Sequence, residues 1–235
     1  MFDLFQLLRA NPYPGRGIVL GRSTDGKKAI VAYWIMGRST NSRNRVFEPT
    51  EDGIRTRAFD ESKVTDPSLI IYHPVRVVEG ATIVTNGDQT DTLADAFRAG
   101  TGFVRALRTR TFEPDGPNYT PRISGMVRPD GSYRLSILKS AEGDPASCQR
   151  FFFEYDAPLP GQGHFISTYD GDGDPLPSFT GEPRPVSLAA PSAAALSREV
   201  WESLDGENKV SLYVSYLDLE TGARESVITN KHQEV

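Results

Sequence analysis

The chain is poor in the residues that cross-link a fold or hold a metal. Its 235 residues include one cysteine, Cys148. This excludes an internal disulfide framework and a cysteine-cluster zinc site. The three histidines, His73, His164 and His232, lack the spacing of metal ligands. We therefore expect no metal site.

Long apolar runs and an excess of positive charge are also missing. No stretch approaches the roughly 18 apolar residues of a membrane span. The start, MFDLFQLLRANPYPGRG, lacks the charged leader and cleavage site of a secretory signal, so we expect a cytoplasmic protein. The formal net charge is −5, which argues against nucleic acid or an anionic membrane as a partner. A basic site in this chain would be a local exception, suited to a small anionic ligand.

The composition that is present favours one β-rich globular domain. Hydrophobic residues make up 38% of the chain, and 12 Phe, 9 Tyr and 2 Trp can build a core. The 21 Gly and 17 Pro residues indicate many turns. A length of 235 residues fits a single core, so we predict one domain over residues 1–235.

Apolar periodicity and turn residues predict about ten strands and two or three helices, an α+β fold. Strands are expected at 17–21, 28–36, 69–74, 75–85 (two strands with a turn), 123–127, 132–138, 149–155, 163–169, 209–217 and 223–229. A short helix or cap is expected at the start, and helical regions at 92–109, interrupted near Gly100, and at 191–204. Residues 46–68 are polar and show little periodicity, so we expect a surface excursion there.

The loop over residues 37–45 is the most informative local feature. It follows the apolar run KAIVAYWIM and contains three arginines, two asparagines and three hydroxyl residues within nine positions. Arginine presents a planar set of donors that matches phosphate and stays charged at neutral pH. The loop therefore indicates either an anion site at the edge of a sheet or a solvated basic turn.

Other motifs give weaker signals. Residues 170–174 (DGDGD) imitate the start of a calcium loop, but the twelfth position is Gly181 where a bidentate Glu is needed. Gly15-Arg16-Gly17 and Gly21-Arg22-Ser23 resemble fragments of a phosphate cradle without the full glycine fingerprint. The proline-framed loop from Glu113 to Arg122 either forms a structural turn or presents its polar groups at low ordering cost.

Four segments in order, GRGIVLGRSTDGKKAIVAYWIMGRSTNSRNR, IIYHPVRVV, VVEGATIVTNGDQTD and NYTPRISGMV, resemble the archaeal-type IMP cyclohydrolases. The likeness runs from about Gly15 to Val127 and is most specific in SRNR and TPRI. It implies a four-layer αββα sandwich of two mainly antiparallel sheets, like the N-terminal-nucleophile hydrolases. It also implies a cyclohydrolase acting on carbon–nitrogen bonds of a cyclic amidine, which converts 5-formamidoimidazole-4-carboxamide ribotide to IMP and water in purine synthesis.

The resemblance implies roles for particular residues and no cofactor. Catalytic roles fall to Tyr72 as a proton carrier, Glu113 as the carboxylate base, and Arg38, which with Arg45 binds phosphate or polarises the formyl oxygen. The other residues implied to bind substrate are Arg45, Asn44 (orienting the carboxamide), Asn118, Tyr119, Thr120, Arg122 and Asn86. Glu113 lies one residue further from Thr-Pro-Arg than in the family pattern, which leaves Asp115 as the alternative base. Asn118 and Tyr119 stand in the opposite order to the family's, so either one can face the site.

The expected partner is a purine ribonucleotide, without nucleic acid or membrane, and the protein is expected to be a homo-oligomer. Two other readings stay open. One is a purine nucleotide-binding protein without catalysis. The other is an amide hydrolase of the same fold, which normally needs a nucleophile at residue 1, where this chain has no Ser, Thr or Cys.

Overall fold

Two antiparallel sheets form the centre of the protein in the computed structural model, which describes residues 1–64 and 71–232. The six-stranded sheet has the order β11 (Arg184–Ser187), β10 (Gln162–Ser167), β1 (Gly17–Arg22), β2 (Lys28–Met36), β12 (Lys209–Asp218) and β13 (Arg224–Asn230). The seven-stranded sheet has the order β3 (Arg45–Thr50), β4 (Gly53–Ala58), β5 (Val75–Val78), β6 (Ala81–Thr85), β7 (Arg122–Val127), β8 (Tyr133–Ala141) and β9 (Asp144–Tyr155).

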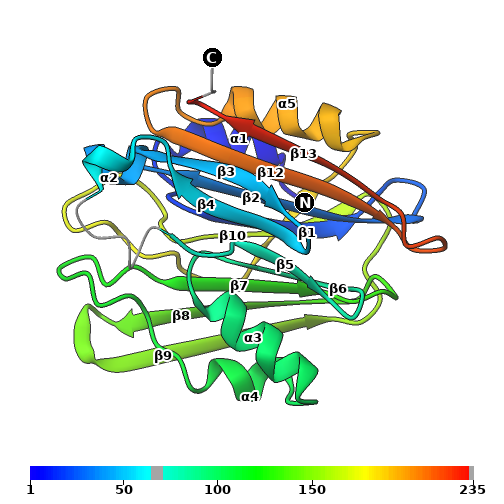
Figure 1. Ribbon diagram of the computed structural model, residues 1–235, viewed down its shortest axis with the longest axis horizontal. Coiled ribbons are helices and arrows are strands. Elements are labelled where there is room, and N and C mark those ends of the chain that lie inside the picture. The colour runs from blue at the N-terminus through cyan, green and yellow to red at the C-terminus, as the bar shows by residue number, and fades with distance from the viewer. Residues whose placement is uncertain (65–70, 233–235) are drawn as a thin grey trace.

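Helices cover the outer face of each sheet (Figure 1). The helices are α1 (Leu4–Ala10), α2 (Thr40–Arg43), the 3₁₀ turn η1 (Glu61–Lys63), α3 (Gln89–Arg98), α4 (Phe103–Leu107) and α5 (Ala193–Ser203). The apolar sides of α1 and α5 pack on the six-stranded sheet, and those of α3 and α4 pack on the seven-stranded sheet. The predicted α+β class is confirmed. No helix in the described part of the chain is long and apolar enough to cross a membrane.

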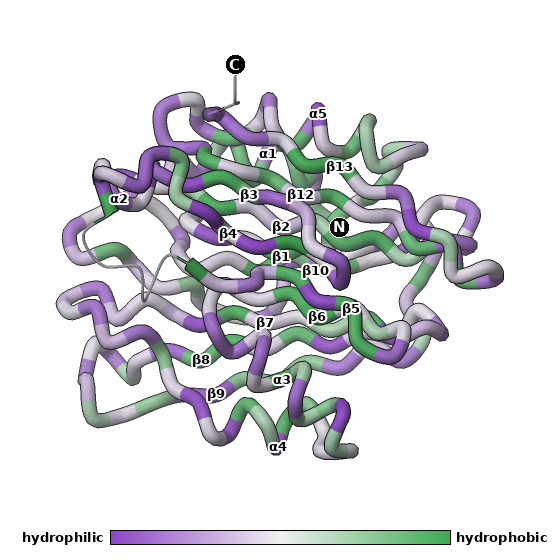
Figure 2. Tube along the Cα trace, in the orientation of Figure 1, coloured by the Kyte–Doolittle hydropathy of each residue, from purple (hydrophilic) through white to green (hydrophobic). Residues whose placement is uncertain are grey.

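The apolar run of β2 shows why the sheets stack. Ile30 and Trp34 contribute to the core under α1 and α5, whereas Val31 and Tyr33 point into the core between the sheets. Successive side chains of a strand face opposite ways, so a strand covered on both faces needs apolar residues at nearly every position. Figure 2 shows this hydrophobic colouring along the central strands, with hydrophilic stretches in many of the connections.

The structure corrects two sequence predictions. The expected surface excursion over 46–68 is wrong, because β3 and β4 form a hairpin there, with Ile54 and Thr56 buried and Arg55 exposed. Of the strand expected at 69–74, residues 69 and 70 lie outside the described residues, and residues 71–74 are not in a strand. The helical region at 92–109 is confirmed as two helices with a break before Phe103.

Strand ends from both sheets meet at one end of the sandwich. Gly17, at the start of β1, pairs with Trp34 near the end of β2 and with Ser167 at the end of β10. A Cβ atom at Gly17 would lie 2.0 Å from the Trp34 ring, so this close approach requires glycine. In the other sheet β7 begins beside the end of β6. The connections leaving these strand ends bring most of the predicted site residues together.

Candidate functional site

Glu113 is a buried carboxylate at this end of the sandwich. Glu113 is 3% exposed, and its backbone N–H donates to Thr120 O at 2.9 Å across the loop before β7. The Asn86 amide donates to Glu113 Oε1 at 3.3 Å and to Pro121 O at 2.9 Å, which holds the carboxylate against the end of β6. Burial raises the pKa of Glu113 to about 7, although the positive charges of Arg16 and Arg122 act to lower it. Such a carboxyl group can accept and return a proton near neutral pH.

Asp115, the alternative base, is engaged within its own loop. One carboxylate oxygen accepts the backbone N–H of Thr120 at 2.7 Å, and the other accepts the Thr120 hydroxyl. These bonds close the turn over residues 115–120, where Tyr119 has a φ of 43°. The local geometry therefore gives Asp115 a structural task and leaves Glu113 facing the charged groups.

One fully buried arginine, Arg45, and one partly buried arginine, Arg16, bring positive charge to Glu113. Arg45 is fully buried at the start of β3, donating from Nε to Ser42 O at 2.8 Å and from Nη2 to Met36 O at 3.4 Å. Its Nη1 has no partner among residues 1–64 and 71–232. Burial, and next the charge of Arg16, lower the pKa of Arg45. Burial also acts to lower the pKa of Arg16, but Glu113 and the surrounding phenols raise it overall.

Arg16 and Arg45 carry two positive charges, whereas Glu113 can carry one negative charge. Arg122 adds a third guanidinium, but it donates from Nη1 to Gln89 Oε1 at 2.6 Å and lies 2.7 Å from Asp88 Oδ1. Uncompensated buried positive charge favours an anionic ligand, because burying an unpaired charge is costly. The arrangement fits a small anion better than a neutral molecule.

Tyr72 lies beside this charged group and is itself 6% exposed. Its hydroxyl is 2.8 Å from that of Tyr33, which extends from β2 into the space between the sheets. Thr56 fixes the backbone of Tyr72 through two hydrogen bonds. Its backbone N–H donates to Tyr72 O at 2.9 Å, and its Oγ1 accepts from Tyr72 N at 2.8 Å. Burial raises the pKa of Tyr33 well above its usual value, so the phenol stays protonated.

A third phenol, that of Tyr169, links the loop of Glu113 to the six-stranded sheet. The Tyr169 hydroxyl, just beyond β10, lies 2.5 Å from Thr120 Oγ1. Burial raises the pKa of Tyr169, and the charge of Arg16 opposes that effect. Thr120 therefore shares its hydroxyl between Asp115 and Tyr169, which positions the loop that carries Glu113.

Other predicted residues lie around this centre with their polar groups engaged. Arg38 is partly exposed, donates to Asp172 Oδ1 at 2.5 Å and to Gly173 O at 3.0 Å, and lies over the Tyr13 ring. The Asn44 amide donates to Asp60 O at 2.7 Å and accepts from Asp60 N at 2.8 Å. Asn118 Oδ1 accepts from Leu176 N at 3.0 Å. The Tyr119 ring packs edge-on against Phe112.

The acidic segment over residues 170–174 serves as a turn. Asp170 accepts from Thr180 and pairs with Arg184 at 2.6 Å, so its carboxylate is committed to the chain. Among residues 1–64 and 71–232, no group of three or more His, Cys, Asp or Glu side chains is placed to hold a metal ion.

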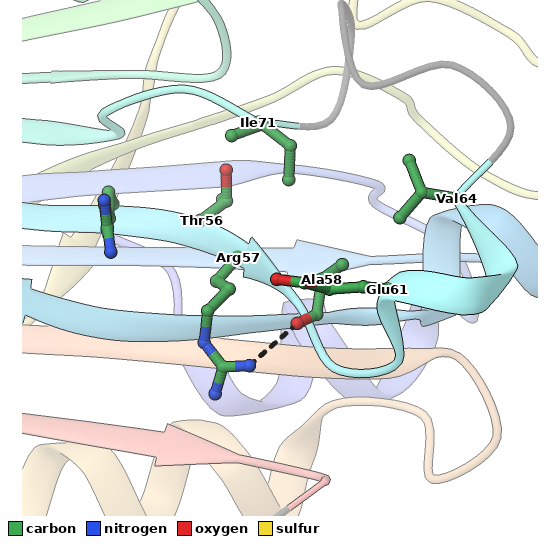
Figure 3. A pocket seen from close by; sticks show the side chains of 7 residues that line it. Thr56, Arg57, Ala58, Glu61, Val64 and Ile71 are labelled. Carbon is green, nitrogen blue, oxygen red and sulfur yellow. Dashed lines mark hydrogen bonds between the residues drawn. The ribbon is translucent and has the colours of Figure 1, made fainter.

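Two hollows adjoin the region. A pocket of about 390 Å³ lies along β4 and η1, next to Ile71; in Figure 3 the Arg57 side chain turns to the Ala58 carbonyl, with Thr56 and Ile71 above it. It borders the segment that carries Tyr72 but includes no predicted site residue. A cavity of about 520 Å³ lies beside Asn118, with Lys139 and Leu176 in its wall.

Sequence reasoning missed three residues of this centre, Arg16, Tyr33 and Tyr169. Tyr33 lies inside an apolar strand run, which predicts a core side chain and gives no functional signal. Tyr169 follows β10 without any motif. Arg16 lies in the Gly-Arg-Gly fragment, and that fragment was the one signal in the sequence that could have found it.

Comparisons with known proteins match this chain to one family. The family model described as "IMP cyclohydrolase-like protein" matches residues 13–222. The IMP cyclohydrolase of Methanosphaera stadtmanae is 30% identical over 162 residues, covering 67% of this chain and 74% of the relative. That of Methanopyrus kandleri is 29% identical over 169 residues, covering 71% and 79%. That of Halobacterium salinarum is 29% identical over 132 residues, covering 54% and 63%. The chain belongs to the IMP cyclohydrolase-like protein family.

Proposed function

We propose that this chain is an IMP cyclohydrolase, which converts 5-formamidoimidazole-4-carboxamide ribotide into IMP and water. Membership of the family supplies the reaction. The observation that carries the assignment to this site is the buried Glu113 carboxyl, with a pKa of about 7, placed among arginines. Ring closure of a phosphorylated substrate needs a proton acceptor and positive charge, and both are present there.

The reaction requires two proton movements in each of two steps. When the carboxamide nitrogen attacks the formyl carbon, that nitrogen loses a proton and the formyl oxygen gains one. When the carbinolamine loses water, the hydroxyl leaves with a proton and the former formamide nitrogen gives one up. One group must accept and then donate, and a second must donate and then accept. We assign the first role to Glu113 and the second to Tyr72.

Substrate binding is assigned to the basic groups and the loops that frame them. We propose that Arg45 binds the phosphate through its unpartnered Nη1 and that Arg38 joins it when Asp172 is displaced. Asn86, Thr120 and Arg122 frame the Glu113 side of the site. For Asn44, Asn118 and Tyr119 we propose supporting roles, because the two amides already bond to backbone groups.

Ultraviolet absorbance provides the test, since ring closure changes the chromophore from an imidazole to a purine. The purified chain should convert the formylated ribotide to IMP, and activity should survive exhaustive chelation. A chain that binds IMP without converting the ribotide would be a nucleotide-binding protein. Loss of activity on chelation, with rescue by a divalent ion, would contradict the metal-free mechanism.

We also propose that the helix–sheet–sheet–helix order represents the fold of the N-terminal-nucleophile hydrolases, here as one domain over residues 1–235. The support is the packing of α1 and α5 on one sheet and of α3 and α4 on the other. Superposition on solved hydrolases of that class tests the fold. Cytoplasmic location and a homo-oligomeric state stay predictions, to be tested by cell fractionation and light scattering.

A further inference from the structure

We propose that Arg16 is a catalytic residue of this site and that its Nε–H binds the formyl oxygen while negative charge develops there. The inference rests on the proposed ring closure and assigns to Arg16 a role that the family resemblance had left to Arg38 or Arg45. Its basis is the position of the side chain, the missing partner of Nε and the groups that surround it.

The backbone of Arg16 is fixed on both sides. Its N–H donates to Thr168 Oγ1 at 3.1 Å, and its carbonyl accepts from Thr168 N at 2.9 Å. Gly15, just before it, has a φ of +70°, and a Cβ atom there would lie 2.3 Å from Thr168 Oγ1. Glycine is therefore required for the chain to turn so tightly, and the turn places Arg16 in the site just before β1 begins.

Arg16 Nε is buried and finds no hydrogen-bond partner in the described part of the chain. A buried donor without a hydrogen-bond partner costs free energy. When such a donor lies in a cluster of acid–base residues, it indicates that a ligand atom accepts its hydrogen bond. Arg22, at the other end of β1, also has an unpartnered Nε, but its Nη2 donates to Asp130 O, far from this cluster along the strand. Of these two arginines, only Arg16 lies in surroundings that suit a role in catalysis.

The groups around Arg16 are those that handle protons. Glu113, Tyr169, Tyr72 and Tyr13 all act on it electrostatically. No ion pair within 4.0 Å joins Arg16 to Glu113 among residues 1–64 and 71–232, so their electrostatic interaction acts over a longer distance than a salt bridge. A substrate oxygen between an arginine donor and the acid–base pair is where a carbonyl would be polarised.

The other arginines are less suited to this task. Arg38 is bound to Asp172, and Arg122 is bound to Gln89 and Asp88. Arg45 has one free donor but is anchored in the basic loop that we assign to phosphate. Arg45 shares with Arg16 an electrostatic interaction with both Glu113 and Tyr72, so its anchoring in the basic loop is what distinguishes the two.

In the proposed step the bond between the carboxamide nitrogen and the formyl carbon forms as the carbonyl π pair moves to oxygen. Arg16 holds this oxygen, Tyr72 protonates it, and Glu113 takes the proton from the nitrogen. The oxygen later leaves as water. IMP therefore lacks the atom that Arg16 binds, and this separates a role in ring closure from a role in nucleotide binding.

The experiment compares Arg16→Gln, Arg16→Lys and the matched control Arg22→Gln by turnover of the formylated ribotide and by calorimetric binding of IMP. Arg16→Gln should lower kcat by roughly 10²–10³-fold, as loss of one oxyanion donor does. Its affinity for IMP should stay within a few-fold of the parent's, and Arg22→Gln should match the parent in both measurements.

The pH profile gives a readout that a structural defect would not move. Glu113 is faced by Arg16 before β1, Arg45 on β3, Arg122 on β7, Asp115 in its own loop and Tyr169 after β10. Removing the charge of Arg16 takes away an effect that lowers the pKa of Glu113, so the acidic limb of kcat/KM should move to higher pH in Arg16→Gln. Arg16→Lys keeps a positive charge, so it should move the acidic limb of kcat/KM less than Arg16→Gln does. Its kcat should still fall.

Three results would overturn the proposal. A fully active Arg16→Gln would remove Arg16 from the reaction. An IMP affinity that falls as much as kcat/KM would make Arg16 a nucleotide ligand instead. A parent chain that binds IMP but converts no ribotide would overturn the proposed function as well, which distinguishes that failure from failure of Arg16 alone.

Discussion

Glu113 and Asp115 are two residues apart, yet their surroundings suit them to different tasks. Asp115 accepts two hydrogen bonds from Thr120 and closes a turn, whereas Glu113 is buried next to positive charge. Glu113→Gln should therefore lower kcat by roughly 10²–10⁴-fold, the usual contribution of a positioned acid–base group. Asp115→Asn should keep more activity, because it retains one acceptor oxygen for the turn. Steady-state kinetics on the formylated ribotide measure both effects.

Tyr72→Phe serves as the companion variant, since it removes one hydroxyl and keeps the ring. It should lower kcat in the same range while IMP affinity stays within a few-fold. An inactive Asp115→Asn beside an active Glu113→Gln would reassign the base to Asp115. If both carboxylate variants are active, the proton acceptor lies elsewhere in the chain.

The raised pKa of Glu113 also predicts how stability depends on pH. In the unfolded chain this carboxyl titrates near 4.5, and in the folded protein near 7, because burial disfavours its charged form. The folded state thus binds more protons between these values, and the group's contribution to the free energy of unfolding is present below pH 4.5 and lost as pH rises through 7. A shift of this size corresponds to on the order of 3 kcal/mol.

Glu113→Gln removes that titration. The free energy of unfolding of the variant minus that of the parent should increase by up to about 3 kcal/mol between pH 5 and pH 8, because only the parent loses stability over this range. Urea denaturation at the two pH values measures the difference, with Asp115→Asn as the control for a nearby carboxyl. A difference between Glu113→Gln and the parent that is the same at both pH values would mean that Glu113 titrates normally.

Prediction from sequence worked for individual residues where a motif contained them. Glu113, Arg45, Tyr72 and Asn86 come from segments with a recognisable pattern, and the structure places them in one region. Arg16 and Tyr169 enter the site from the opposite sheet, through pairings that no local pattern encodes. Glu113 and Asp115 could not be separated from sequence, because their burial and hydrogen bonds depend on the folded loop.

At the scale of elements, the loop over residues 170–178 binds one arginine of the candidate site, Arg38. Asp172 holds Arg38 in a partly exposed ion pair, and Asn118 holds the same loop through Leu176 N. If Arg38 contributes to phosphate binding, substrate must first compete with Asp172. Exposed ion pairs contribute about 0–1 kcal/mol. Asp172→Asn should therefore tighten IMP binding by up to about five-fold, as measured by titration calorimetry.

Asp174 provides a matched control on the same loop, because it forms no ion pair within the described residues. Asp174→Asn should leave IMP affinity unchanged. Equal affinities in Asp172→Asn and the parent would show that Arg38 is not a phosphate ligand. The double variant Arg38→Ala with Asp172→Asn should lose the gain, which would confirm that the effect acts through Arg38.

Sequence predicted elements best where both faces of a strand are buried or where a turn is strongly encoded. The runs of β2 and β12 and the hairpin of β7 and β8 are of this kind. β3 and β4 were missed because Arg55 and Arg57 on the outer face pair with Glu48 and give the segment a polar composition. Buried and exposed residues do alternate along β4, but the charged residues hid this strand pattern in the sequence.

For the whole molecule, the path of the chain joins the two sheets into one cooperative unit. It builds β1 and β2 in one sheet, then β3 to β9 in the other, and returns to the first for β10 to β13. The six-stranded sheet needs segments from both ends of the chain, and the core between the sheets contains side chains from both, such as Tyr33 and Ile123. Although the net charge is −5, the site gathers arginines from both sheets, so binding depends on the assembled fold.

This topology predicts a single unfolding transition. Fluorescence of Trp34 and Trp201, both on the side of the six-stranded sheet, should coincide with circular dichroism of the whole chain in thermal and urea unfolding. IMP at 100 times its Kd should stabilise the protein by about 2.7 kcal/mol, and thus raise Tm by roughly 5–10 °C for a chain of this length. Both probes should move together, because the proposed site takes residues from both sheets. Two separated transitions, with only one shifted by IMP, would show that the chain folds as two units and contradict a single domain over residues 1–235.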